Sequence, residues 1–457
     1  MPVSPRPARR VLPSPAFSLL TLFMAMLLVA GGASRADVYG QAVIRGSAAA
    51  LMTFCILMAD RREFAVGSRA VYLFALLSLG LPLLQLVPMP PSLWEMLPSH
   101  KILLQAVHGP QPWRPLAIVP DAAINAAASL LVPLAALVLN ATLPASERNC
   151  VATLILAFIV CSTLVGLLQL SGAGIDNPLI NDVRGAVSGP FANRNHFALL
   201  LAIGGVLTPL WAFRHGEQSL WRLPVAIVLC ILFFLLILAT GSRAGIVLGA
   251  LGVAAGLAIE WSSFNRILRR VPQRMRLLIC GAGVAFGALL ITISIYADRV
   301  QSINRAMSLN AADDMRVRGF ATVLSMVRTG FPYGNGFGSF EPLFRLNEPD
   351  HLLKPTYFNH AHNDFIEIVH DGGVIGLLLL ITALGWWAWA SIRAWRLEPS
   401  PSSKLARTGS IILGLVFLAS IVDYPARTPI IMTISSIAAL WLAWARGTKG
   451  TGRFTLP

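Results

Sequence analysis

The stretch LPVAIVLCILFFLLILATGSRAGIVLGALGVAAGLAI, residues 223–259, contains one charged side chain, Arg243. The apolar runs on either side of its TGSRAG turn (240–245) approach the length of about 20 residues that an α-helix needs to cross a bilayer. Two spans joined by so short a turn predict an antiparallel helical pair with Arg243 at the membrane surface. The stretch therefore predicts a helical membrane protein.

The rest of the chain has the same character. Of its 457 residues, 56% are hydrophobic and 12% are charged, whereas a soluble domain has about 25% charged residues. The sequence thus predicts an all-α integral membrane protein with about 12 transmembrane helices. The predicted spans are residues 16–32, 40–59, 70–87, 123–140, 151–170, 195–213, 223–240, 244–260, 277–297, 374–392, 409–423 and 428–445.

The basic residues predict the orientation of these spans. If the N-terminus is cytoplasmic, most arginines and lysines fall in cytoplasmic segments, including five arginines within residues 266–276. Basic residues concentrate in the cytoplasmic loops of membrane proteins, so both termini are predicted to be cytoplasmic. The net charge of +15 therefore does not indicate a nucleic-acid partner. Residues 298–373 are then one long loop on the outer side.

Four parts follow from this layout. Residues 1–122 contain the N-terminal spans and an outer interfacial segment, and residues 123–297 contain the central spans that carry Arg194 and Arg243. Residues 298–373 form the long loop with His362, and residues 374–457 contain the C-terminal spans and the cytoplasmic tail. In the outer interfacial segment, Trp94 and Trp113 are predicted to anchor the chain at the lipid head groups.

The stretch TYFNHAHNDFIEIVHDGGVIG, residues 356–376, gathers three histidines and three acids at the end of the long loop. His360 and His362 are two residues apart, so they point to different sides of a helix. One turn after His362 comes Ile366, which cannot bind a metal, so the spacing argues against a metal site. A single histidine beside an anion site can instead act as a general base. The alternative is a histidine that only caps or hydrogen-bonds the loop.

Two arginines lie at the predicted outer ends of spans. Arg194 follows Asn193, a candidate helix cap, and Arg243 follows a turn whose amide groups favour an anion. Guanidinium groups bind phosphate oxygens in a bidentate manner, so both residues suit the diphosphate of a lipid-linked sugar. Arg194 has an alternative role, in which its side chain lies among lipid head groups. His362 would then take the proton of an attacking sugar hydroxyl, and a single displacement would invert the anomeric carbon.

The segment GFPYGNGFGSF, residues 330–340, contains four glycines. It lacks the preceding strand and the spacing of a dinucleotide-binding loop. The glycines are predicted to allow close packing of backbone near the membrane surface.

Four segments resemble those of the O-antigen ligase / O-antigen polymerase family of bacterial membrane glycosyltransferases. They are GPFANRNHFALLLAI (189–203), TGSRAGIVLGAL (240–251), MRVRGFATVLSMVRTGFPYGNGFGSFEPLF (315–344) and HAHNDFIEIVHDGGVIGLLLL (360–380). They occur in the order found in the family, with one large periplasmic loop. The resemblance implies a GT-C-like fold in the bacterial inner membrane, with an active site that faces the periplasm.

The resemblance also implies roles for single residues. Arg194 and Arg243 are similar to the arginines that hold an undecaprenyl-diphosphate-linked glycan donor, and His362 to the histidine that activates the acceptor hydroxyl. Arg316 corresponds to an arginine that assists the diphosphate, and Asn193 and Asn363 are further candidate substrate-binding residues. No metal or other cofactor is implied.

The acceptor and the function class leave alternatives open. Acceptors in the family are lipid A-core in lipopolysaccharide biosynthesis, a second lipid-linked glycan, or protein, and the sequence does not choose among them. The alternative function is a transporter or flippase for a lipid-linked or anionic substrate. It is less favoured because the chain shows no internal repeat, and its ionisable residues gather at the outer edge and not at the midplane.

Overall fold

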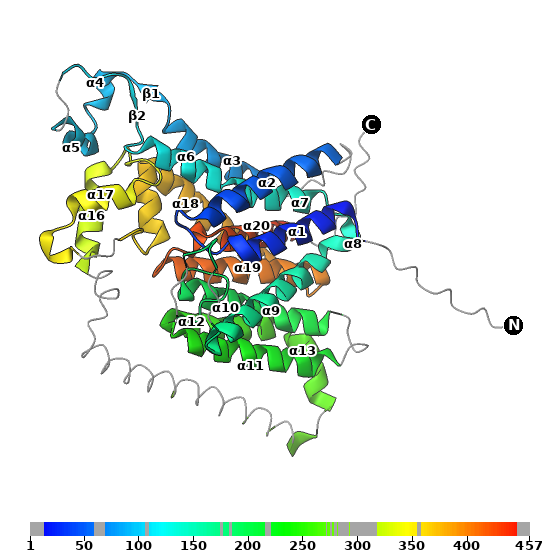
Figure 1. The fold of residues 1–457 in the computed structure, drawn as a ribbon. Helices are drawn as coiled ribbons and strands as arrows, with labels where there is room; N and C mark the ends of the chain where they lie inside the picture. The colour runs from blue at the N-terminus through cyan, green and yellow to red at the C-terminus, as the bar shows by residue number, and fades with distance from the viewer. Residues whose placement is uncertain are drawn as a thin grey trace, which may run out of the picture.

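The protein is almost entirely helical (Figure 1). The computed structural model describes residues 13–58, 69–105, 109–173, 177–181, 185–214, 221–270, 318–353 and 358–445, together with isolated positions between 272 and 292. Within these residues the strands are β1 (Pro88–Met89) and β2 (Arg114–Pro115), which pair in antiparallel fashion. The predicted all-α class is thus confirmed for the described part of the chain.

Seven helices of the described part are long and apolar enough to cross a membrane. They are α2 (Tyr39–Met58), α6 and α7 (together Pro120–Ala141), α8 and α9 (together Ala145–Leu170), α10 (Arg194–Phe213), α11 (Arg222–Thr240), α18 (Asp364–Arg396) and α19 (Pro401–Ser420). An eighth candidate combines α12 (Arg243–Ile259) with α13 (Trp261–Arg270), which bends away by 76°. The shorter apolar helices are α1 (Pro15–Ala30), α3 (Arg69–Leu84) and α20 (Pro429–Ala443).

These helices coincide with all but one of the predicted spans. The exception, 277–297, lies outside the described residues apart from isolated positions. The structure therefore supports a multi-pass membrane protein, and the number twelve stays a prediction. The long outer loop is described only from residue 318 onward, so its first part also stays a prediction.

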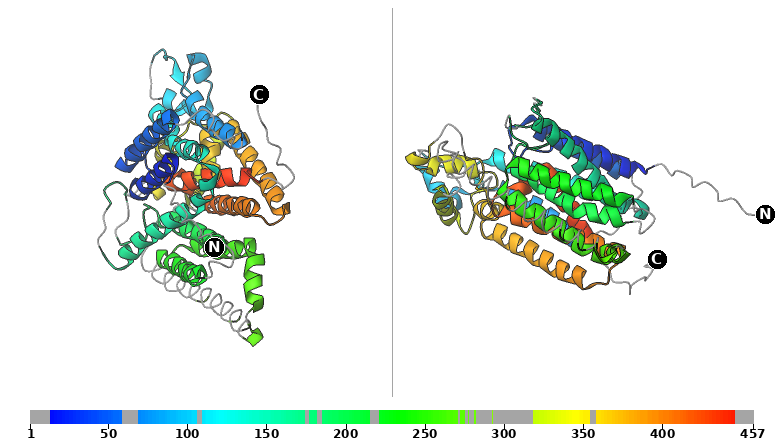
Figure 2. Two further views of the ribbon diagram at one scale, coloured as in Figure 1. Left: turned by 90° about the vertical axis from the view of Figure 1, so that its right-hand side faces the viewer. Right: turned by 90° about the horizontal axis from the view of Figure 1, so that it is seen from below.

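The long helices lie side by side in one bundle (Figures 1 and 2). At one end of the bundle are four short helices, α4 (Pro91–Trp94), α5 (Lys101–Leu104), α16 (Phe320–Gly330) and α17 (Phe340–Asn347), and at the other end is α8 (Ala145–Arg148). If the predicted orientation holds, the end with α16 and α17 faces outward.

Helix α10 forms the centre of the bundle, where it packs against α9, α11, α12 and α19. Glycines of α12 let this helix approach α10 unusually closely. A Cβ atom at Gly252 would lie 2.4 Å from the carbonyl oxygen of Ala202, and one at Gly245 would lie 2.4 Å from the Cβ of Ala198. Small residues at such a contact let membrane helices approach backbone to backbone. The first turns of α10 and α12 are thereby held together.

The glycine-rich segment after α16 packs against a break in α18. At Gly373 the backbone of α18 has φ 57° and ψ −141°, which only glycine adopts readily. The amides of Asn335 and Gly336 donate to the carbonyl oxygens of His370 and Asp371, each at 3.0 Å. A Cβ at Gly373 would lie 2.2 Å from the carbonyl oxygen of Pro332. The predicted close backbone packing is confirmed.

The outer segment between α3 and α6 folds back on itself through the β1–β2 pair. Trp94 is buried there, 2% exposed, and its indole Nε1 donates to the carbonyl oxygen of Pro115 at 3.1 Å. The guanidinium of Arg114 lies over one face of the indole and His100 packs against it. The prediction that Trp94 anchors the chain among lipid head groups is therefore wrong, because these neighbours enclose the ring. Trp113 is 66% exposed, and its anchoring role stays a prediction.

Candidate active site

Asp423 joins three elements of the bundle at its outer end. It lies in the turn between α19 and α20 and is almost fully buried. Its Oδ2 accepts from the side-chain amides of Asn193 at 3.1 Å and Asn195 at 2.7 Å. Its Oδ1 lies 3.2 Å from Nδ1 of His362 and accepts from the amide of Tyr424 at 3.0 Å. One carboxylate thus connects the start of α10 with the loop that carries His362.

The carboxyl group of Asp423 is held in its ionised form. Burial raises the pKa of Asp423, but contacts with the rings of His196 and His362 outweigh burial and hold the pKa well below its ordinary value. An ionised carboxylate can only accept hydrogen bonds. Nδ1 of His362 must therefore carry the proton that points at Asp423, and in the neutral ring the lone pair is then on Nε2.

His362 has an unusual backbone. Its φ of 50° makes it the one residue other than glycine with positive φ among those described. Such a conformation costs about 1–3 kcal/mol and persists where the surroundings enforce it, often at functional sites. The next residue, Asn363, caps α18 by accepting from the amide of Ile366 at 3.0 Å, and its amide donates to the carbonyl oxygen of Ile421 at 2.9 Å. The ring of His362 is therefore fixed by both its loop and its carboxylate partner.

The arginines are placed by the helix starts that carry them. Asn193 caps α10 as predicted, because its side chain accepts from the amide of Asn195 at 2.9 Å. Arg194 is the first residue of that helix, and among the described residues no carboxylate lies within ion-pair distance of it. Arg243 is the first residue of α12, which Ser242 caps by accepting from the amide of Gly245 at 3.0 Å. Arg316 lies outside the described residues, so its role stays a prediction.

A second charged cluster surrounds Arg427. Arg427 contacts three carboxylates of α18: Asp364 at 3.4 Å, Glu367 at 3.2 Å and Asp371 at 3.7 Å. Burial lowers the pKa of Arg427, but these carboxylates outweigh burial and raise it above its ordinary value. The guanidinium therefore stays charged and ties the α19–α20 turn to the first turns of α18.

A large cavity of about 1380 Å³ lies beside this second cluster. Most of its wall consists of apolar side chains of α3, α7 and α18, including Trp386 and Trp387. Polar residues line its outer end, among them His360, Asp364 and Arg427. A cavity with an apolar body and a polar end suits an amphipathic molecule. Its lining does not include Arg194, Arg243 or His362.

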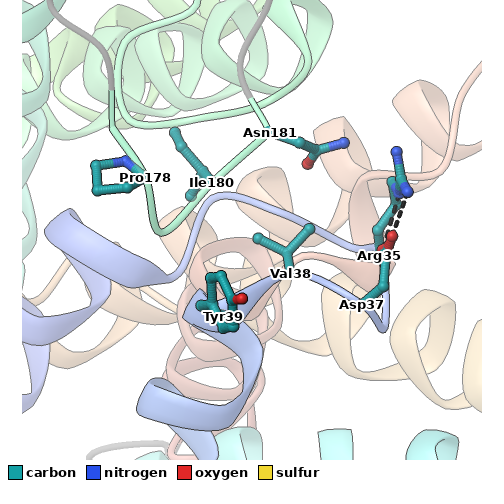
Figure 3. A pocket seen from close by; sticks show the side chains of 7 residues that line it. All are labelled: Arg35, Asp37, Val38, Tyr39, Pro178, Ile180 and Asn181. Carbon is teal, nitrogen blue, oxygen red and sulfur yellow. Dashed lines mark hydrogen bonds and ion pairs between the residues drawn. The ribbon is translucent and has the colours of Figure 1, made fainter.

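A smaller pocket of about 220 Å³ lies between the α1–α2 connection and residues 178–181 (Figure 3). Its charged side chains, Arg35 and Asp37, form an ion pair with each other. Both also line the large cavity. The two charges of the small pocket therefore neutralise each other.

A comparison with protein families gives one match. Residues 227–381 match the sequence model of a family described as O-antigen ligase. This match, over about a third of the chain, supports the assignment of the chain to the O-antigen ligase family. A comparison with curated proteins found no match. The family assignment supports a glycosyltransferase of the O-antigen ligase or polymerase type, and it favours the enzyme over the transporter.

The O-antigen ligase match covers only part of the cluster. It contains Arg243, His362 and Asn363, whereas Arg194 and Asn193 precede it and Asp423 and Arg427 follow it. Asp423 and Arg427 are not among the site residues predicted from the sequence. A signal was present, because an acid at the end of an apolar run is costly in a membrane and therefore marks a functional candidate. Among the described residues, no group of three or more His, Cys, Asp or Glu side chains is arranged to hold a metal ion.

Proposed function

We propose that the protein transfers a glycan from an undecaprenyl-diphosphate-linked donor to the hydroxyl group of an acceptor at the periplasmic face of the bacterial inner membrane. The observation that carries this proposal is the contact of His362 with Asp423, which also binds Asn193 and Asn195 on either side of Arg194. A carboxylate-backed histidine beside an arginine is an arrangement that can deprotonate a hydroxyl and hold an anionic leaving group.

In the proposed reaction His362 is the general base. Nε2 takes the proton from the acceptor hydroxyl, and the oxygen attacks the anomeric carbon of the donor sugar. The bond from that carbon to the diphosphate oxygen breaks, and the diphosphate leaves with the electron pair. One displacement inverts the anomeric carbon. Asp423 holds the tautomer with Nδ1–H and stabilises the imidazolium that forms.

Arg194 and Arg243 are proposed to bind the diphosphate. Each is the first residue of its helix, where the amide groups and the helix dipole favour an anion. The contact of Gly245 with Ala198 keeps the two helix starts adjacent. Two guanidinium groups at this place would stabilise the negative charge that develops on the leaving diphosphate. The proposal requires no metal ion.

The direct test is reconstitution of the purified protein in lipid nanodiscs. A lipid-diphosphate glycan would be supplied as donor, and lipid A-core or a second lipid-linked glycan as acceptor. The proposal expects a product of inverted anomeric configuration in the presence of EDTA. Which acceptor is elongated would separate a ligase from a polymerase. If no acceptor is glycosylated while the donor crosses the bilayer, the protein is a flippase and the proposal is wrong.

A further inference from the structure

His360 forms a second histidine–carboxylate pair next to the one proposed for catalysis. Its Nδ1 lies 2.8 Å from Oε1 of Glu367, a residue that is 1% exposed. The other oxygen of Glu367 accepts from the amide of Ala361 at 2.7 Å, and Arg427 lies 3.2 Å from Oε1. Glu367 is therefore held as an acceptor, and Nδ1 of His360 must donate to it. The lone pair of His360 is on Nε2.

The ring of Tyr424 contacts both histidines. Its ring centroid lies 4.4 Å from that of His360 and 4.9 Å from that of His362. His362 contacts Asp423, which also binds Asn193 and Asn195. His360 lines the outer end of the large cavity, and among the described residues none bonds to its Nε2. The polar end of the cavity thus contains a hydrogen-bond acceptor, Nε2 of His360, whose ring contacts the same tyrosine as the proposed base.

The charges at this end of the cavity are compensated. Arg427 has three carboxylate partners, and the lining arginines Arg345 and Arg35 are paired with Glu341 and Asp37. A further lining arginine, Arg45 of α2, donates to the side-chain oxygen of Asn125 and has no carboxylate partner among the described residues. Arg194, which does not line the cavity, has no carboxylate within ion-pair distance among the described residues. An anionic head group is therefore favoured at Arg194. A neutral group with hydroxyls is favoured beside His360, where it can donate to Nε2 and where the charge of Arg427 is compensated.

We propose that His360 binds a hydroxyl group of the acceptor, and that this acceptor is a glycolipid whose apolar part occupies the large cavity. The inference rests on the proposed function and names the acceptor class that the proposed function left open. His360 would act as a binding residue that presents the sugar to His362, while His362 takes the proton. A soluble protein acceptor would leave the apolar part of the cavity without a role.

The experiment uses binding, so that it does not depend on turnover. The full-length protein in nanodiscs is labelled with an alkyl glucoside that carries a photoreactive group in its chain. An alkyl phosphate with the same chain is the second probe. The glucoside is expected to label the cavity helices α3 and α18 more strongly than the phosphate. Replacing His360 by Ala should weaken glucoside labelling roughly tenfold, as expected for the loss of one buried hydrogen bond.

Matched variants separate binding from folding. His360→Gln should retain most of the labelling, because its side-chain oxygen can accept in place of Nε2. His351→Ala, at an exposed histidine of the same loop, should label like the wild type. Ala383→Trp, which fills the cavity, should block labelling, whereas Ile381→Trp, on an exposed face of the same helix, should not.

The outcomes are distinct. The inference is overturned if the glucoside labels His360→Ala as strongly as the wild type, or if the phosphate probe labels the cavity more strongly than the glucoside. It is also overturned if His351→Ala loses as much glucoside labelling as His360→Ala. In the transfer assay, His360→Ala should raise the acceptor KM about tenfold and leave the donor KM unchanged. A loss of kcat with unchanged acceptor KM would make His360 the base and would also overturn the inference. If wild-type protein binds the glucoside but transfers nothing, the proposed function fails and the binding site stands.

Discussion

At the scale of single residues, the backbone of His362 offers a clean test of its proposed role. Asparagine tolerates the left-handed conformation that His362 adopts, but it cannot accept a proton. His362→Asn should therefore insert and fold while its transfer rate falls by about 10²- to 10⁴-fold, the usual contribution of a general base. The rate is measured with the lipid-diphosphate donor at saturating acceptor. His351→Asn is the control, and equal losses in both variants would remove His362 from the mechanism.

The arginines permit a second test at this scale. Arg243→Ala should lower transfer by about 10²- to 10³-fold, as the loss of one group that stabilises the developing charge does. Arg243→Lys should also fail, because an ammonium group cannot bind two phosphate oxygens in the planar manner of a guanidinium. Both variants are assayed in nanodiscs after their expression and insertion have been checked. Full activity of the lysine variant would show that charge alone suffices and that bidentate binding is not needed.

Asp423 predicts a specific dependence of stability on pH. Its pKa is lowered in the folded state and is about 3.9 in an unfolded chain, so its contribution is fully present above about pH 5. That contribution is lost as the pH falls through the folded-state pKa. Asp423→Asn should lower the free energy of unfolding by about 3 kcal/mol near pH 7. The difference in Tm from the wild type should not shrink between pH 7 and 5, because protonation of the histidine partners can only strengthen their contact with an ionised Asp423, and it should shrink only below about pH 4. If the Tm difference already shrinks at pH 6, the assignment of an ionised Asp423 is contradicted.

At the scale of elements, the contact between the glycine-rich segment and the break in α18 determines where the histidine loop lies. Gly373→Ala forces an alanine into a backbone conformation that suits glycine and directs its Cβ at Pro332. We expect a loss of about 3 kcal/mol or more in the free energy of unfolding. Gly385→Ala in the same helix is the control, because nothing lies within 4 Å of its added Cβ. It should be neutral or stabilise the helix by up to about 1 kcal/mol. Equal Tm shifts in the two variants would contradict this account.

The elements also show how far the sequence could predict the site. Hydropathy located the helices because a span must be apolar along its whole length. The helix starts at Asn193 and Ser242 were readable from their turn residues. The partner of His362 could not be predicted from the sequence, because Asp423 lies 61 residues further along the chain. It reaches the site only through packing of the α19–α20 turn. Trp94 was misplaced for the same reason, since its enclosing neighbours Pro115 and Arg114 come from beyond the turn.

At the scale of the whole molecule, the outer end contains two unlike regions. In one region the helix starts of α10 and α12 present arginines and amides, and in the other a large apolar cavity ends in compensated charges and His360. A transferase that joins two membrane-bound substrates needs two such regions, so that donor and acceptor approach a common base from different directions. The bundle therefore favours transfer between two lipid-anchored molecules.

The orientation of the whole bundle is the last expectation and decides whether these regions can meet periplasmic substrates. In a background with all five cysteines replaced, single cysteines would be introduced at two exposed positions, Leu353 near the proposed site and Ser146 at the opposite end. A membrane-impermeant maleimide applied to cells with a permeabilised outer membrane should label Leu353→Cys and spare Ser146→Cys, because the basic segments hold the latter end in the cytoplasm. After disruption of the inner membrane, the maleimide should label both introduced cysteines. Labelling of Ser146→Cys alone in intact spheroplasts would place His362 in the cytoplasm, where a periplasmic transfer is impossible.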